Sequence, residues 1–171
     1  MKILMKSLLA AVTLLSTALP QSALAADPKL EGKYSDWTAY SRAESGDKIC
    51  YVLTSPKSKS PGNVNHGDIY FMVANWKSGA AKEQPSFLAG FPIKNVPPPK
   101  ARIGSKSYEM YVSQNEAFVE SRTDERNLVK AMRAGATMRV QAVSQRGTSV
   151  SYEFSLKGVT AALAKAKSAC T

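Results

Sequence analysis

The segment LVKAMRAGATMRVQAVSQRGTSVSYEFSLKGVTAALAKAKSAC (residues 128–170) decides the fold. It continues an amphipathic helix predicted over residues 124–134. Residues 137–144 and 148–156 follow as two β-rich runs around an Arg-Gly turn, which predicts a hairpin. An alanine-rich helix over residues 159–169 comes last. The segment therefore predicts a strand pair between two helices, and it contains no catalytic motif.

The ends of the helix at 124–134 are marked by the residues that flank it. Thr123 is a candidate N-cap, and Asp124 and Glu125 complement the helix dipole in the first turn. Gly135 stands where a C′ glycine is expected.

The preceding chain predicts short strands separated by turns. These strands are expected at residues 34–40, 49–54, 68–76, 86–93, 101–103, 108–112 and 117–119. Gly90 and Pro92 indicate a bulge or an edge position, and residues 57–67 read as a loop. Because strands do not alternate with long helices, we predict an antiparallel β-sandwich with two short helices in the C-terminal third.

Residues 1–25 have the pattern of a cleaved secretory signal peptide. Lys2 and Lys6 form a positive start, an apolar core covers residues 7–19, and Ala23-Leu24-Ala25 is a small-x-small cleavage site. The apolar core is too short to span about 30 Å of hydrocarbon. We therefore expect residues 26–171 to form a single exported domain, periplasmic or otherwise in the cell envelope, with no transmembrane segment after signal removal.

The chain has two cysteines, Cys50 and Cys170. Export would place both in an oxidising compartment. An even number of exported cysteines predicts a structural disulfide. A redox role is the alternative, but no Cys-x-x-Cys motif brings two thiols together. Two cysteines and one histidine also make a poor zinc set, so no metal or cofactor site is expected.

His66 is the only histidine and the only candidate histidine base. It could be oriented by Asp68, but its Pro/Gly-rich surroundings favour a solvated surface residue. The chain lacks a Gly-x-Ser-x-Gly elbow, a Ser-x-x-Lys motif and a phosphate-binding glycine loop. No catalytic residue is predicted, and we expect the protein not to be an enzyme.

The net charge of the chain indicates which kinds of partner it could bind. Loss of Lys2 and Lys6 with the signal leaves 21 of 23 Lys and Arg against 13 Asp and Glu. Such an excess could favour anionic partners, although scattered charges are more simply a source of solubility. Aromatic residues interleave with basic ones, but core packing explains them, and an exported protein is not expected to bind nucleic acid.

Several pieces of the chain, taken in order, resemble the invasion-associated locus B family of exported proteins from Gram-negative bacteria. The matching pieces are SDWTAY (35–40), CYVL (50–53), AGFPIK (89–94), LVKAMRAG (128–135), SQRGT (144–148), YEFSLKGVTAAL (152–163) and AC (169–170). Some relatives carry an additional cysteine pair. Position 41 is serine here, which leaves Cys50 and Cys170 as the only pair.

The resemblance implies an envelope β-sandwich, broadly immunoglobulin-like, without an agreed catalytic motif. Invasion itself is not carried over to this chain. We therefore expect a non-enzymatic periplasmic or envelope protein that binds an unknown protein partner or supports the cell surface, and a link to host-cell interaction is a further prediction. The alternative is a binding module for an anionic envelope ligand such as lipopolysaccharide.

Overall fold

The structure is a computed structural model that describes residues 27–171, so the predicted signal peptide lies outside the described residues. The described chain forms eleven strands and two helices. They are β1 (Lys29–Tyr34), β2 (Trp37–Glu44), β3 (Asp47–Thr54), β4 (Ser58–Ser60), β5 (Tyr70–Trp76), β6 (Gln84–Leu88), β7 (Lys100–Ile103), β8 (Lys106–Ser113), β9 (Glu116–Val119), α1 (Arg122–Ala134), β10 (Thr137–Val143), β11 (Ser149–Ser155) and α2 (Val159–Ala169).

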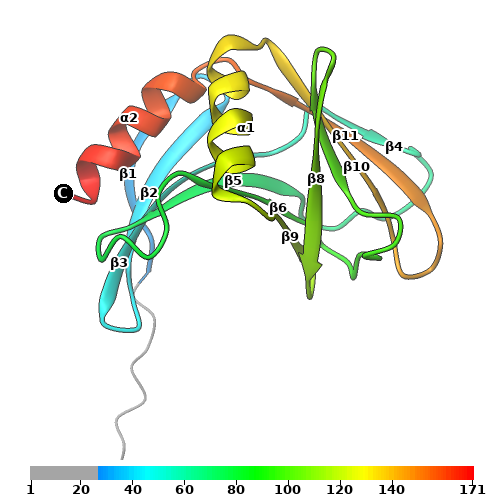
Figure 1. Ribbon diagram of the computed structural model, residues 1–171, viewed down its shortest axis with the longest axis horizontal. Coiled ribbons are helices and arrows are strands. Elements are labelled where there is room, and N and C mark those ends of the chain that lie inside the picture. Colours follow the sequence, from blue (N-terminus) through cyan, green and yellow to red (C-terminus); the bar gives the residue numbers. More distant parts are fainter. Residues whose placement is uncertain (1–26) are drawn as a thin grey trace, which may run out of the picture.

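All strands pair antiparallel in one sheet, in the order β1-β2-β3-β5-β6-β9-β8-β7-β10-β11-β4 (Figure 1). The predicted fold class, mainly antiparallel β with two late helices, is confirmed. In this spatial order the sheet has two halves: the first runs from β1 through β2, β3, β5 and β6 to β9, and the second from β8 through β7, β10 and β11 to β4. The halves stay hydrogen-bonded between β9 and β8, where Met110 pairs with Val119. The sandwich is therefore one sheet folded over on itself.

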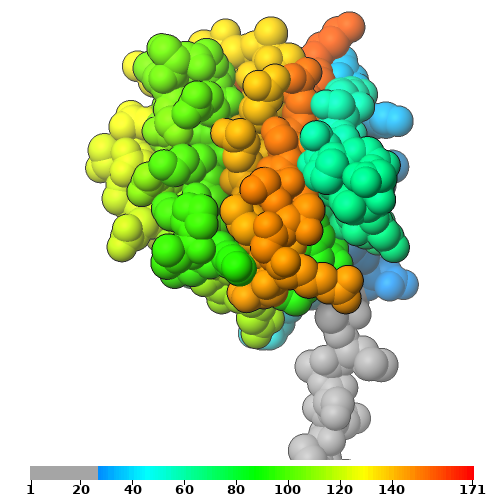
Figure 2. Space-filling model, turned by 90° about the vertical axis from the view of Figure 1, so that its right-hand side faces the viewer, coloured from blue at the N-terminus to red at the C-terminus, as the bar shows by residue number. Residues whose placement is uncertain are grey.

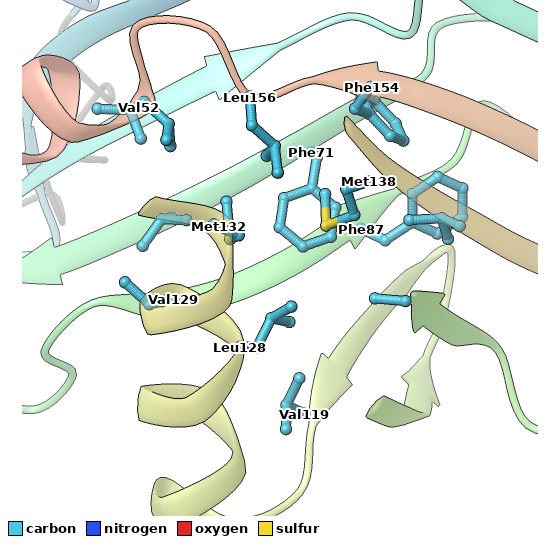
Figure 3. Close-up of a cluster of buried hydrophobic side chains, with 14 of the residues drawn as sticks. Val52, Phe71, Phe87, Val119, Leu128, Val129, Met132, Met138, Phe154 and Leu156 are labelled. Carbon is cyan, nitrogen blue, oxygen red and sulfur yellow. The ribbon is translucent and has the colours of Figure 1, made fainter. Parts of the chain in front are cut away.

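The core lies between the inner faces of the two halves (Figure 3). The Phe71 and Phe87 rings of the first half meet the Phe154 ring of the second at centroid distances of 5.8 and 6.5 Å. Leu128 and Met132 of α1 are fully buried against the same cluster. Burial of such aliphatic and aromatic side chains contributes about 1.5–3 kcal/mol each, so this junction stabilises the folded sheet.

The hairpin predicted in the C-terminal segment is confirmed. β10 and β11 pair from Thr137 with Ser155 to Val143 with Ser149. Gly147 adopts φ +89° in the turn, which glycine tolerates without steric cost. Alternate side chains of both strands face the core.

The ends of α1 differ from the prediction in two ways. Ser121, not Thr123, is the N-cap and accepts a hydrogen bond from the Asp124 N–H. Gly135 has an extended backbone at φ −92°, not a left-handed one. A Cβ there would lie 2.7 Å from Ile103 Cγ2, so close packing accounts for the glycine.

The predicted Cys50–Cys170 disulfide is confirmed, with an S–S distance of 2.10 Å. Cys50 is fully buried in β3, and Cys170 is the C-cap of α2. The bond therefore attaches the end of the last helix to an early strand of the sheet.

Both edge strands lie where polar or loop segments were expected. β1 covers a charged stretch next to β2, and β4, within the predicted loop 57–67, pairs with β11. Figure 2 shows β4 beside β11 on the outer face of the second half. The expected bulge or edge at Gly90 and Pro92 was wrong, because β6 ends at Leu88 and lies between β5 and β9.

Candidate functional site

A groove of about 1080 Å³ lies between α1 and α2. Both helices lie on the same side of the sheet, and the turn from β5 to β6 closes one end of the space between them (Figure 1). We call it the basic groove. Its charged lining consists of six basic residues and two acidic ones: Lys77, Lys82, Arg122, Arg126, Arg133, Lys167, Glu83 and Glu125.

Helical spacing explains why these residues face each other. Arg122, Arg126 and Arg133 lie three or four residues apart, or a multiple of that, along one face of α1. Ala164 and Lys167 lie on the corresponding face of α2. Folding therefore brings six basic residues that are scattered along the sequence into one groove.

Two α1 arginines bind groups of the protein itself. Arg122 donates to the Ala80 carbonyl at 2.8 Å and lies 3.6 Å from the Glu125 carboxylate. Arg133 pairs through both terminal nitrogens with Glu83. These contacts hold the β5–β6 turn against α1, so both arginines position the groove wall.

The lysines of the groove are different. Lys77, Lys82 and Lys167 are exposed, and within residues 27–171 none has a carboxylate within 4.0 Å. Their positive charge is therefore available to a ligand.

Asn75 adds a neutral polar group to the lining. Its Oδ1 accepts the Glu83 N–H at 3.0 Å, which fixes the orientation of the amide. Its Nδ2 is buried and has no acceptor in the described part of the chain. Because buried donors are nearly always paired, this one indicates a place for an acceptor.

The turn that carries Lys77 is anchored by Asp47 of β3. Asp47 accepts the Ser78 N–H at 3.2 Å and the Ser78 hydroxyl at 2.5 Å. The Ser78 hydroxyl lowers the pKa of Asp47 most, and the Lys48 N–H lowers it further. The carboxylate therefore stays ionised, and the anchor intact, to below the usual pH range of an aspartate.

His66 is not the solvated residue that the sequence predicted, because it is only 7% exposed. Its Nε2 lies 2.8 Å from the Pro61 carbonyl, which can only accept, so Nε2 carries a proton. Its Nδ1 lies 2.8 Å from the Tyr152 hydroxyl, and burial raises the pKa of that phenol far above its ordinary value. We call His66, Tyr152 and Pro61 the His66 cluster. With both ring nitrogens bound, the cluster attaches a loop to the core.

Residues 27–171 offer neither a cluster of metal ligands nor a membrane-spanning helix. No three or more His, Cys, Asp or Glu side chains gather where they could hold a metal ion. None of the helices there is long and apolar enough to cross a membrane.

The fold and the groove define a class: an antiparallel β domain, folded over on itself, with a basic groove between two helices on its inner side. The family model "Invasion associated locus B (IalB) protein" matches residues 37–167, and the chain belongs to this family. The chain is also similar in fold to the crystal structure of invasion associated protein B from Bartonella henselae. That match has 14% identity and a TM-score of 0.56, and covers 86% of this chain and 97% of that one. No curated protein sequence matches.

Proposed function

We propose that this chain is a non-enzymatic binding protein of the cell envelope, and that its basic groove holds an anionic ligand such as lipopolysaccharide. The observation that carries the proposal is that Lys77, Lys82 and Lys167 lie beside a groove of ligand size and have no carboxylate partner among residues 27–171. Exposed cations of this kind attract anions and contribute little to folding.

The predicted signal peptide, the disulfide and the family membership support an exported location. The His66 cluster supports a non-enzymatic role, because both ring nitrogens of the only histidine are bound within the fold. A turnover lost in a His66→Gln variant that still folds would contradict that part of the proposal. The family description refers to invasion, and a link of this chain to host cells remains a separate prediction.

Salt dependence of binding tests the proposal. The dissociation constant for purified lipopolysaccharide is measured at 50 mM and 500 mM NaCl, with a neutral dextran as control. We expect binding that weakens at least tenfold over this range, because exposed charges are screened within about 10 Å at 0.1 M salt and within about 3 Å at 1 M. Binding that is unchanged by salt, or equal for the neutral glycan, would contradict an electrostatic site.

A further inference from the structure

The six cations of the groove are not equivalent. Arg122 and Arg133 already bind Ala80, Glu125 and Glu83. Arg126 donates to the Thr123 hydroxyl at 3.2 Å. In the part of the chain that the structure describes, the groove cations without a side-chain partner are the lysines of the β5–β6 turn and of α2, so an incoming anion is expected on that side of the groove.

The chemistry of these lysines favours a compact anion with several oxygens. An ammonium group is a point charge with three rotatable donors and binds phosphate, and the planar arginine fork binds a carboxylate or a phosphate through two parallel hydrogen bonds. Arg133 fulfils that second role within the protein by pairing with Glu83. Three lysines that line one groove, unpaired within residues 27–171, supply more positive charge than a single carboxylate neutralises, and a phosphate monoester carries about −1.5 to −2.

The uncharged part of the lining consists mainly of small residues and one buried amide. Leu163 is fully buried, and Gly79 and Ala164 are small. The Trp76 ring packs with Ile49 and Tyr51 on the other face of the sheet. The groove thus exposes no large aliphatic side chain, while the Asn75 amide requires an acceptor oxygen.

We infer that the ligand of the basic groove is a phosphate ester of a sugar-like polyhydroxyl group. Lys77, Lys82 and Lys167 hold the phosphate, and the Asn75 Nδ2 donates to an oxygen of the sugar. This inference rests on the proposed function and specifies its ligand. The same chemistry occurs in soluble sugar phosphates and in the phosphorylated sugar head group of lipopolysaccharide.

Titration of the ¹⁵N-labelled protein with three probes tests the inference by NMR. Glucose 6-phosphate is expected to shift the Asn75 side-chain amide and the backbone amides of residues 75–83 and 160–171. Inorganic phosphate should shift the lysine-bearing segments more weakly and leave the Asn75 side chain unmoved, and glucose should shift neither. Equal effects of glucose 6-phosphate and phosphate, or shifts confined to another face, would overturn the inference.

Two variants locate the contacts. Lys167→Gln is expected to weaken glucose 6-phosphate binding about fivefold, the usual contribution of one basic residue near an anionic surface. Asn75→Asp keeps an oxygen for the Glu83 N–H but removes the NH₂ group, so it should abolish the preference for glucose 6-phosphate over phosphate. Unchanged affinity in Lys167→Gln, or an unchanged preference in a folded Asn75→Asp, would overturn the assignment.

Lipopolysaccharide and its enzymatically dephosphorylated form distinguish the two sources. If phosphorylated lipopolysaccharide binds more tightly than glucose 6-phosphate, the ligand is the lipid head group. If glucose 6-phosphate binds more tightly, the ligand is a soluble sugar phosphate. Both outcomes support the inference. Equal, salt-sensitive binding of both lipopolysaccharide forms would overturn the phosphate inference while leaving the proposed anionic site standing. Absence of binding to every anionic probe would overturn both.

Discussion

The basic groove and the His66 cluster are two polar regions of one molecule with opposite organisation. In the His66 cluster the polar groups are buried and bound to each other, at 2.8 Å on both sides of the ring. In the groove the lysines are exposed and lack carboxylate partners within residues 27–171. Paired, buried polar groups are costly to disrupt, whereas exposed charges can be changed at little cost to folding. The comparison therefore fits a stabilising role for the His66 cluster and the proposed binding role for the basic groove.

The disulfide is expected to have the largest effect, because it fixes the end of α2 to β3 and also lies in the groove lining. Replacing both Cys50 and Cys170 by alanine should lower the free energy of unfolding by about 2–5 kcal/mol, since the bond closes a loop of most of the domain. Binding should weaken as well, because Cys170 lies in the groove lining at the end of α2.

Urea denaturation with and without reductant measures this effect, and intact mass should show a gain of two protons on reduction. Identical denaturation curves in the two conditions would contradict a stabilising bond.

His66→Ala should lower the free energy of unfolding by about 2–3 kcal/mol, because it leaves the Tyr152 hydroxyl buried without a partner. Tyr152→Phe, which removes only the hydroxyl, should cost about 1–2 kcal/mol. Neither variant should change affinity for lipopolysaccharide when folded. Loss of affinity without loss of stability would show that the cluster is a binding site, contrary to the comparison.

Gly90→Ala tests how tightly the His66 loop is packed. A Cβ at Gly90 would lie 2.6 Å from the Asp68 nitrogen and 2.9 Å from the His66 carbonyl oxygen. We expect a cost of about 1–3 kcal/mol by overpacking, seen as a lower urea midpoint. Gly62→Ala is the control, because a Cβ there meets nothing within 4 Å; an equal effect of both substitutions would rule out the packing explanation.

The groove lysines are expected to have the smallest effect on folding. Lys77→Gln, Lys82→Gln and Lys167→Gln should each change the free energy of unfolding by no more than about 0.5 kcal/mol, because the side chains are exposed. Urea denaturation of the three variants measures this, and a larger loss in any of them would mean that the lysine supports the groove wall.

Local patterns in the sequence predicted much of the fold. The β10–β11 hairpin, both helices and the disulfide were predicted from alternation, helical spacing and cysteine number. β1 and β4 were missed because edge strands with a solvated side keep polar residues on both faces, and their short, charged stretches resemble loops.

The basic groove and the His66 cluster could not be predicted from local sequence patterns. Lys77 and Lys167 are far apart in the sequence, and only the packing of α2 beside the β5–β6 turn brings them to one groove. His66 lies among glycine, proline and asparagine, and its burial depends on Tyr152, which is 86 residues away. The one available signal was the i, i+4 spacing of Arg122 and Arg126, which marked a basic face on α1.

The most direct test of the central claim compares two triple variants of equal charge. One is Lys77→Gln/Lys82→Gln/Lys167→Gln, and the other replaces three exposed lysines outside the groove, Lys33, Lys106 and Lys157, by glutamine. The dissociation constant for lipopolysaccharide is measured for both at 50 mM NaCl. We predict a loss of affinity of about a hundredfold in the groove variant, at about fivefold for each lysine, and little change in the control. Equal losses in the two variants would show that net charge, and not the groove, determines binding.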